Sequence, residues 1–265
     1  MERHEVATRQ LVCELPDVGV TVRRDMLWHG TDGRELTFDI YQASTAERPV
    51  PAVLFVTGYP DAGVQRMLGC NAKDMESYDG WGRLLAASGL AAIAYVNHEP
   101  IADAHAILAH VRRNAPALGI DAACIGVWAC SGNVPNALSL LIHASPRLAC
   151  AALSYGHMLD LDGSTAVADA AAAWRFVNPC AGRTLDDVPG DVPMFIGRAG
   201  CDETAGLNDS IDRFVSKALA LNRPVTVVNH HTAPHAFDTA DNSDASRAVI
   251  RHLLEFLRNA MRAGA

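Results

Sequence analysis

The sequence lacks long hydrophobic runs and clusters of basic residues. No run approaches the roughly 18 apolar residues of a membrane-spanning helix, so we expect no membrane partner. The first 17 residues, MERHEVATRQLVCELPD, carry charges where a secretory signal needs an unbroken apolar stretch. The formal net charge is -8, from 22 Lys and Arg against 30 Asp and Glu. Because binding to phosphates needs clustered cations, we expect no nucleic-acid partner, and small molecules or proteins remain.

Cysteine is scarce, and its spacing excludes the usual disulfide frameworks and zinc fingers. The seven cysteines lie at positions 13, 70, 124, 130, 150, 180 and 201. Their number is odd, and they form no CxxC pair and no zinc-finger spacing. We therefore expect reduced, mostly buried cysteines in a cytoplasmic protein.

The sequence is rich in patterns that predict buried strands. Hydrophobic residues make up 49% of the 265 residues and charged residues 20%, as in ordinary globular proteins. Residues 34–42 alternate apolar with polar side chains, which predicts a half-exposed strand paired with residues 18–28. Continuous apolar runs then follow at residues 50–58, 89–97, 123–130 and 148–156. Each run is too short for a helix and suits a strand buried on both faces.

Helical patterns alternate with these runs, at residues 101–119, 131–145, 207–222 and 244–262, and further strands are predicted at 191–200 and 223–231. This alternation predicts an α/β fold, with one domain over residues 1–265 and a mostly parallel sheet covered by helices on both faces. Residues 64–81 have the character of a loop. Residues 158–190 are irregular, and two interpretations stay open: a lid-like insertion over the site, or an ordinary surface helix and loop.

The stretch CSGN joins the third apolar run to the following helix. In a parallel sheet, ligands bind beyond the carboxyl ends of the strands, and Ser131 lies at such an end. A sharp strand-to-helix turn needs small neighbours, and here Ala129 and Asn133 stand where the GxSxG form of the nucleophile elbow has glycine. Asn is suited to this position because it tolerates left-handed backbone angles. The other interpretation is a serine that only caps the helix.

Two further residues fit a base and an acid for this serine. A serine hydroxyl needs a base to take its proton and a third group to orient that base. Asp202 follows the strand at 191–200, and His235 lies in the loop beyond the last strand, in the chain order Ser, Asp, His. Other candidates for these two roles are Glu203, Asp209 and Asp160 for the acid, and His230 and His231 for the base. The histidines at 230 and 231 fall at the strand end itself, where a structural role is favoured.

Acyl transfer also needs donors for the developing oxyanion. The backbone N–H of Gly132, directly after the serine, is one candidate. The second is expected in the turn TGYPDAG, where Gly58 allows close approach and the backbone N–H of Tyr59 can donate. A plain strand exit is the alternative.

Other residues near the same edge have weaker functional interpretations. Cys130 adjoins the serine, and a thiol is the better intrinsic nucleophile, but the turn directs Ser131 outward. His98 and Glu99 end another strand and are candidate pocket residues or a helix cap. His231 and His235 have the spacing of a helical metal pair, but Pro234 between them blocks a helix, so no metal is expected. An apolar lining is suggested by Met67, Met75, Trp81 and Trp174, with ordinary core packing as the alternative.

With these motifs the chain resembles the α/β-hydrolases, and more narrowly the branch related to dienelactone hydrolase. The resemblance runs from about residue 51 to the C-terminus and is carried by LFVTGYPDAG, GWGRLLAASGLAAIAYVN, LGIDAACIGVWACSGN, GRAGCDETAGLNDSIDRF and APHAFDT. It implies a sheet of eight strands, a Ser or Cys nucleophile with Asp and His, and neither a metal nor an organic cofactor. Dienelactone hydrolase itself uses a cysteine nucleophile and a glutamate in the loop where this chain has TGYP.

The sequence therefore predicts a serine hydrolase that cleaves a carboxylic ester or lactone of a small molecule. Acyl transfer to another acceptor and cleavage of a carbon–carbon bond by the same residues stay open, as does a non-catalytic binding protein of the same fold. The physiological substrate and the oligomeric state are not predicted.

Overall fold

The computed structural model describes residues 3–14, 18–45 and 49–262, and its strands form one eight-stranded sheet in the order β1-β2-β4-β3-β5-β6-β7-β8. The strands are β1 (Val20–His29), β2 (Glu35–Ala43), β3 (Val50–Phe55), β4 (Ala91–Tyr95), β5 (Ile120–Cys130), β6 (Ala151–Ser154), β7 (Met194–Ala199) and β8 (Val225–His230). Strand β2 is antiparallel to both β1 and β4, and the pairs from β4 through β8 are parallel. The predicted hairpin and the predicted mostly parallel sheet are confirmed.

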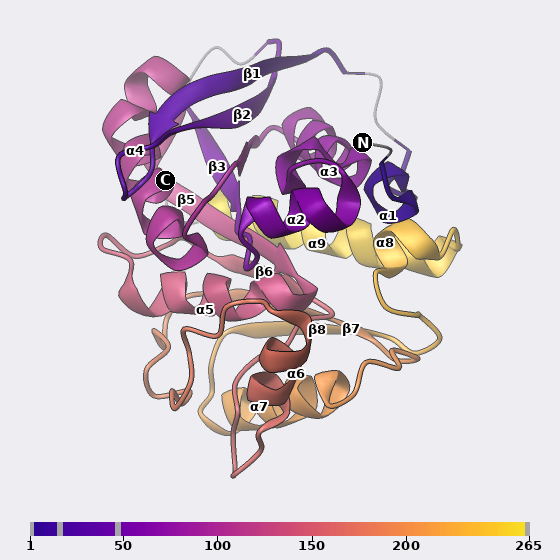
Figure 1. The fold of residues 1–265 in the computed structure, drawn as a ribbon. Helices are drawn as coiled ribbons and strands as arrows, with labels where there is room; N and C mark the ends of the chain where they lie inside the picture. Colours follow the sequence, from indigo (N-terminus) through magenta and orange to yellow (C-terminus); the bar gives the residue numbers. More distant parts are fainter. Residues whose placement is uncertain (1–2, 15–17, 46–48, 263–265) are drawn as a thin grey trace.

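Helices cover both faces of this sheet (Figure 1). The helices are α1 (Glu5–Thr8), α2 (Asp61–Leu68), α3 (Glu76–Ala87), α4 (Pro100–Leu118), α5 (Val134–His143), α6 (Ala166–Trp174), α7 (Leu207–Ala220), α8 (Phe237–Ala240) and α9 (Asp244–Arg262), with 3-10 turns η1 (Ala72–Asp74) and η2 (Ser131–Asn133). Helices α4, α5 and α7 pack one apolar cluster against the sheet, and α3 and α9 pack the other. The fold thus buries the central strands on both sides, as their continuous apolar sequences require.

Residues 64–81, expected to be a loop, are mostly helical, so that expectation was wrong. They contain most of α2, all of η1 and the first half of α3. Glycines at positions 80 and 82 weaken the helical pattern in the sequence, but Gly82 has a packing reason. A Cβ there would lie 2.7 Å from the Tyr41 ring, so the helix reaches the sheet this closely only without a side chain. Trp81, Leu84 and Leu85 then fill the core beside it.

Candidate active site

The turn after β5 holds Ser131 in a conformation that side chains rarely adopt. Its φ angle is 55°, in the left-handed region, which costs a residue other than glycine about 1–3 kcal/mol. Such strain persists only where the surrounding structure enforces it, and Ala129 before the turn is fully buried. Asn133 is right-handed, with φ -84° and ψ -20°, so the expectation that asparagine served here to accept left-handed angles was wrong. Ser131 itself takes the strained position.

The three side chains that the sequence singled out form a continuous hydrogen-bonded chain. Ser131 Oγ lies 2.9 Å from His235 Nε2, and His235 Nδ1 lies 2.6 Å from Asp202 Oδ2. If Nδ1–H donates to the carboxylate, Nε2 carries the free lone pair and accepts the serine proton. The residues follow β5, β8 and β7, whose carboxyl ends share one edge of the sheet. This arrangement can activate a hydroxyl for attack on a carbonyl.

Asp202 is held as a carboxylate beside the histidine. Its side chain is 0% exposed, and burial by itself would raise its pKa. Hydrogen bonds from His235 and from the backbone N–H of Thr204, at 2.9 Å, outweigh burial and lower the pKa from its ordinary value. The negative charge therefore persists at neutral pH and can stabilise a protonated imidazole.

The competing acids and bases have other partners. Asp160 accepts the backbone N–H groups of Val167 and Ala168 at the start of α6, at 2.8 and 3.0 Å. Asp209 is paired with Arg213 within α7. The ring of His230 is buried and lies 3.1 Å from the Ser246 hydroxyl. Glu203 and His231 are exposed. None of these five side chains is hydrogen-bonded to the serine or to His235 in the described part of the chain.

The loop after β3 is hydrogen-bonded directly to the turn that carries Ser131. The N–H of Gly58 donates to Asn133 Oδ1 at 2.7 Å, and a Cβ on Gly58 would lie 2.5 Å from the carbonyl oxygen of Gly132. The side chain of Asn97 holds the same loop from the other side, donating to the Tyr59 carbonyl at 3.0 Å. Because the Gly58 N–H is engaged, the Tyr59 N–H is the remaining candidate here for an oxyanion donor.

The buried carboxylate of Asp61 supports this loop, and sequence reasoning missed it. It accepts the backbone N–H groups of Asn97 and Ala72, at 2.8 and 2.7 Å. Burial raises the pKa of Asp61 to about 6 although these two hydrogen bonds lower it. The sequence offered one signal of this role, because Asp61 stands three residues after Gly58, the glycine that follows a strand. An acid at that position equally suits a simple helix cap.

Cys130 is positioned beside the site but is not activated. Burial raises the pKa of its thiol to about 12, so almost no thiolate forms at neutral pH. Cys130 lines a cavity that Ser131 also lines, and its sulfur lies 4.0 Å from Asn133 Nδ2. The hydroxyl rather than the thiol is the group that contacts the histidine.

Two cavities meet at Ser131. A small one of about 210 Å³ is lined by Tyr59, Ser131, Gly132, His157, Trp174, Phe176, Thr204 and His235. A larger one of about 460 Å³ extends from the same serine beneath α1 and α2. Trp174, which is 64% exposed, and Tyr59 line both, so they form the boundary between the two.

The larger cavity has mainly apolar walls. Its lining includes Val6, Val64, Met67, Leu68, Met75, Tyr78 and Trp128. Among the residues suggested for an apolar lining, Met67, Met75 and Trp174 line it, whereas Trp81 is core and donates from Nε1 to Asp238 at 2.8 Å. The irregular segment supplies Trp174 and Phe176, and α1 also contributes to the wall.

His98 and Glu99, the other candidate pocket residues, line neither cavity. His98 Nε2 lies 2.8 Å from Arg34, next to the β1–β2 hairpin. Glu99 occupies the N-cap position of α4, but its largely exposed side chain makes no capping hydrogen bond, and Asp103 accepts the backbone N–H groups of His98 and Glu99 instead.

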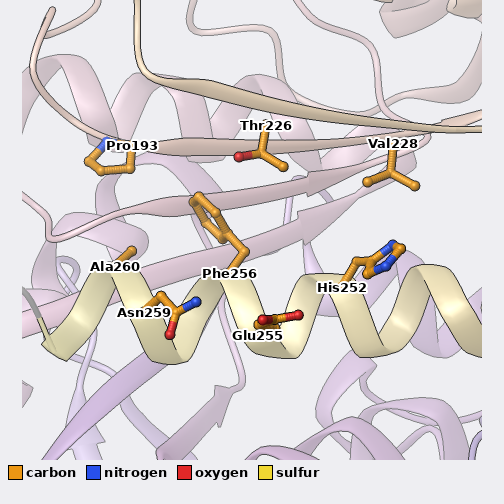
Figure 2. A pocket seen from close by; sticks show the side chains of 8 residues that line it. All are labelled: Pro193, Thr226, Val228, His252, Glu255, Phe256, Asn259 and Ala260. Atoms are coloured by element: carbon orange, nitrogen blue, oxygen red, sulfur yellow. The ribbon is translucent and has the colours of Figure 1, made fainter.

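A further hollow lies between β8 and α9, away from Ser131 (Figure 2). Its volume is about 580 Å³, and Phe256 points into it from α9 toward the sheet (Figure 2). The lining residues are Pro193, Thr226, Val228, His252, Glu255, Phe256, Asn259 and Ala260. Among these described residues no hydrogen bond joins the Thr226 hydroxyl to a base, in contrast to Ser131 and His235.

Other expectations from the sequence concern cysteines, metals and membranes. All seven cysteines lie in the described residues and are free. Within residues 3–14, 18–45 and 49–262, no group of three or more His, Cys, Asp or Glu side chains is arranged to hold a metal ion. No helix in the same ranges is long and apolar enough to cross a membrane.

Solved structures similar to this one include several esterases. A bacterial heroin esterase matches with a TM-score of 0.70 and 17% identity, covering 95% of this chain and 87% of its own. A structure from a study of two fungal esterases from Rhizomucor miehei matches with a TM-score of 0.74 and 17% identity, covering 95% of this chain and 86% of its own. Brefeldin A esterase, a bacterial homologue of human hormone sensitive lipase, matches with a TM-score of 0.69 and 16% identity, covering 97% of this chain and 82% of its own.

The chain has the α/β-hydrolase fold. The fold class expected from the sequence, with eight strands, is therefore confirmed. No protein-family profile and no curated protein sequence matches the chain. The likeness to esterases, at identities below 20%, establishes the fold, and the reaction has to be argued from the residues at the site.

Proposed function

We propose that this protein hydrolyses carboxylic esters or lactones of small molecules, with Ser131 as the nucleophile. The observation that carries the proposal is the pair of hydrogen bonds joining Ser131, His235 and Asp202, at 2.9 and 2.6 Å, at the entrance to two cavities. A serine, a histidine and a buried carboxylate in this relation serve acyl transfer on several unrelated folds.

In the first step, His235 takes the proton of Ser131 as the serine oxygen attacks the carbonyl carbon. The carbonyl oxygen becomes an oxyanion, which the backbone N–H groups of Gly132 and Tyr59 stabilise. Asp202 orients His235 and stabilises its protonated form. His235 then gives its proton to the leaving alcohol oxygen as the carbon–oxygen bond breaks, leaving an acyl group on the serine.

In the second step, water replaces the alcohol. His235 removes a proton from the water, the resulting hydroxide attacks the acyl carbon, and the serine leaves with the proton from the histidine. No redox or metal chemistry is needed for these two reaction steps.

The motif APHAFDT and the serine elbow support a place in the branch related to dienelactone hydrolase, and the free cysteines support a cytoplasmic location.

The test is the hydrolysis of 4-nitrophenyl butyrate by the Ser131→Ala variant. Loss of the nucleophile should lower kcat by about 10⁴-fold or more, because serine and histidine act as a unit. Ser88→Ala, at the far end of α3, is the matched control and should keep the wild-type rate. A Ser131→Ala variant that is folded and retains more than a tenth of the wild-type kcat would disprove the proposed nucleophile.

A further inference from the structure

His157 is a buried polar residue of the small cavity that the proposed chemistry does not use. It lies three residues after the end of β6, at the same edge of the sheet as Ser131. Its side chain is 2% exposed and stacks on Phe176, with ring centroids 5.3 Å apart and an angle of 23° between the planes. The stacking fixes the plane of the imidazole against one wall of the cavity.

One ring nitrogen of His157 has no partner. Nδ1 is buried and makes no hydrogen bond within the described residues. A buried polar atom without a partner is costly, and the large majority of such atoms in folded proteins are paired. His157 itself lines the cavity that opens on Ser131, so its ring is placed to meet a polar group of a ligand bound there.

The ring is neutral at ordinary pH. Burial, with a smaller contribution from the nearby His235, lowers the pKa of His157 to about 4. A neutral imidazole has one N–H donor and one acceptor nitrogen, and it offers no charge to a carboxylate or a phosphate. Among the residues that the structure describes, no lysine or arginine lines the small cavity. The partner with matching chemistry is a neutral group that both donates and accepts, such as a hydroxyl.

Other hydroxyl groups gather in the same cavity. The Tyr59 hydroxyl lies next to Gly132, where an added Cβ would contact it, and Thr204 also lines the cavity. The larger cavity contrasts with this, because side chains such as Met67, Leu68 and Met75 form its walls. The two spaces at Ser131 therefore differ in the groups that they can accept.

We propose that the small cavity is a subsite for a hydroxyl group of the substrate, and that His157 recognises this hydroxyl by a hydrogen bond. The inference rests on the proposed ester hydrolysis and deepens it. The substrate class is an ester that joins a short hydroxylated part, held beside His157, to a longer apolar part held in the larger cavity.

Two matched pairs of esters test this. The first is 2-hydroxyethyl octanoate against propyl octanoate, with the hydroxyl on the alcohol part. The second is octyl 3-hydroxypropanoate against octyl butanoate, with the hydroxyl on the acyl part. The wild-type protein should hydrolyse the hydroxylated member of one pair with a kcat/KM about 10-fold or more above that of its partner, because a buried hydrogen bond discriminates on this scale.

The variant His157→Phe keeps an aromatic ring against Phe176 and removes both nitrogens. The preference should fall to within about 2-fold of unity, and His157→Gln, which keeps a donor and an acceptor, should retain part of it. Each preference is a ratio measured on one sample, so a general loss of activity does not alter it. His252→Phe, in the hollow beside α9 (Figure 2), is the matched control and should leave the preference as in the wild type.

Several outcomes would overturn the inference. Equal rates within both pairs for the wild type would show that the small cavity does not recognise a hydroxyl. A preference that survives in His157→Phe would assign recognition to other residues. If the wild type hydrolyses none of the four esters and also fails to hydrolyse 4-nitrophenyl butyrate, the proposed function itself fails, and the inference fails with it.

Discussion

The two cavities that meet at Ser131 are built from different parts of the chain. The polar groups of the small cavity come from segments directly after strands, such as Tyr59 after β3 and His157 after β6. The walls of the larger cavity come mostly from helices and turns outside the sheet, including α1 and α2. The sheet edge thus supplies the proposed catalytic groups, and the surrounding helices determine the shape of the apolar space.

This difference indicates that catalysis and substrate specificity depend on separate sets of residues. Positions at the sheet edge are fixed by strand pairing and by tight contacts, such as the bond from Gly58 to Asn133. The apolar walls depend on side chains that can be exchanged without altering the hydrogen-bonded chain at the serine. Changes at the edge should therefore affect all substrates, and changes in the apolar wall should affect only some.

After the nucleophile itself, the largest effect is expected at the acid. Asp202→Asn should lower kcat by about 10³–10⁴-fold on every ester, because the amide no longer fixes the histidine tautomer that accepts the serine proton. The measurement is steady-state hydrolysis of a short and a long ester. Asp160→Asn, at the start of α6, is the control and should stay within about 10-fold of the wild type. Equal activities of the two variants would refute the assignment of the acid.

A moderate effect is expected at the hydrogen bond between the loop after β3 and the turn that carries Ser131. Asn133→Ala removes the acceptor for the Gly58 N–H, and kcat should fall about 10–100-fold because the neighbouring Tyr59 N–H is no longer held in place. Asn133→Asp keeps an acceptor oxygen and should lose less. Kinetics on short and long esters should show the same factor for both. A loss confined to long esters would instead place Asn133 in substrate packing.

A smaller and selective effect is expected in the apolar wall. Met75→Trp narrows the larger cavity, so kcat/KM for octanoyl or octyl esters should fall about 10-fold relative to that for short esters. The ratio of the two values is the measurement. Phe256→Trp, in the hollow beside α9, is the control and should leave the ratio unchanged (Figure 2). An equal loss of kcat/KM on long and short esters would show that the larger cavity does not determine specificity separately from the groups at the sheet edge.

The smallest effect is expected at Cys130. Its thiol pKa is raised to about 12, so at pH 8 only about one part in 10⁴ is thiolate, the form that iodoacetamide alkylates. Mass spectrometry after treatment at pH 8 should find the exposed Cys201 modified and Cys130 unmodified. Prompt alkylation of Cys130 would mean that the thiol is activated and competes with Ser131.

The sheet and the groups at its carboxyl edge could be predicted from the sequence, because apolar runs and strand ends are local patterns. Ser131, Asp202 and His235 each follow such a run, and the shared edge of a parallel sheet brings them together. His157 also follows a run, and the same argument could have found it.

The walls of the two cavities could not be predicted from the sequence, because they depend on contacts between segments that are far apart in the chain. Helix α3 was not predicted because of its glycines, and these pack against distant segments: Gly82 lies against the ring of Tyr41, and Gly80 lies against Leu11. His98 follows a strand end as Ser131 does, yet Arg34 from the hairpin holds it away from the cavities. The role of Asn133 depends on a partner 75 residues earlier in the chain.

The most direct test of the central claim is reaction of the purified protein with a fluorophosphonate, followed by mapping of the modified peptide by mass spectrometry. The account predicts phosphonylation of Ser131 in the wild type and its loss in His235→Ala, because only the histidine activates this hydroxyl. Label on another residue, or unlabelled Ser131 in a folded sample that hydrolyses esters, would contradict the assignment of Ser131 as the nucleophile.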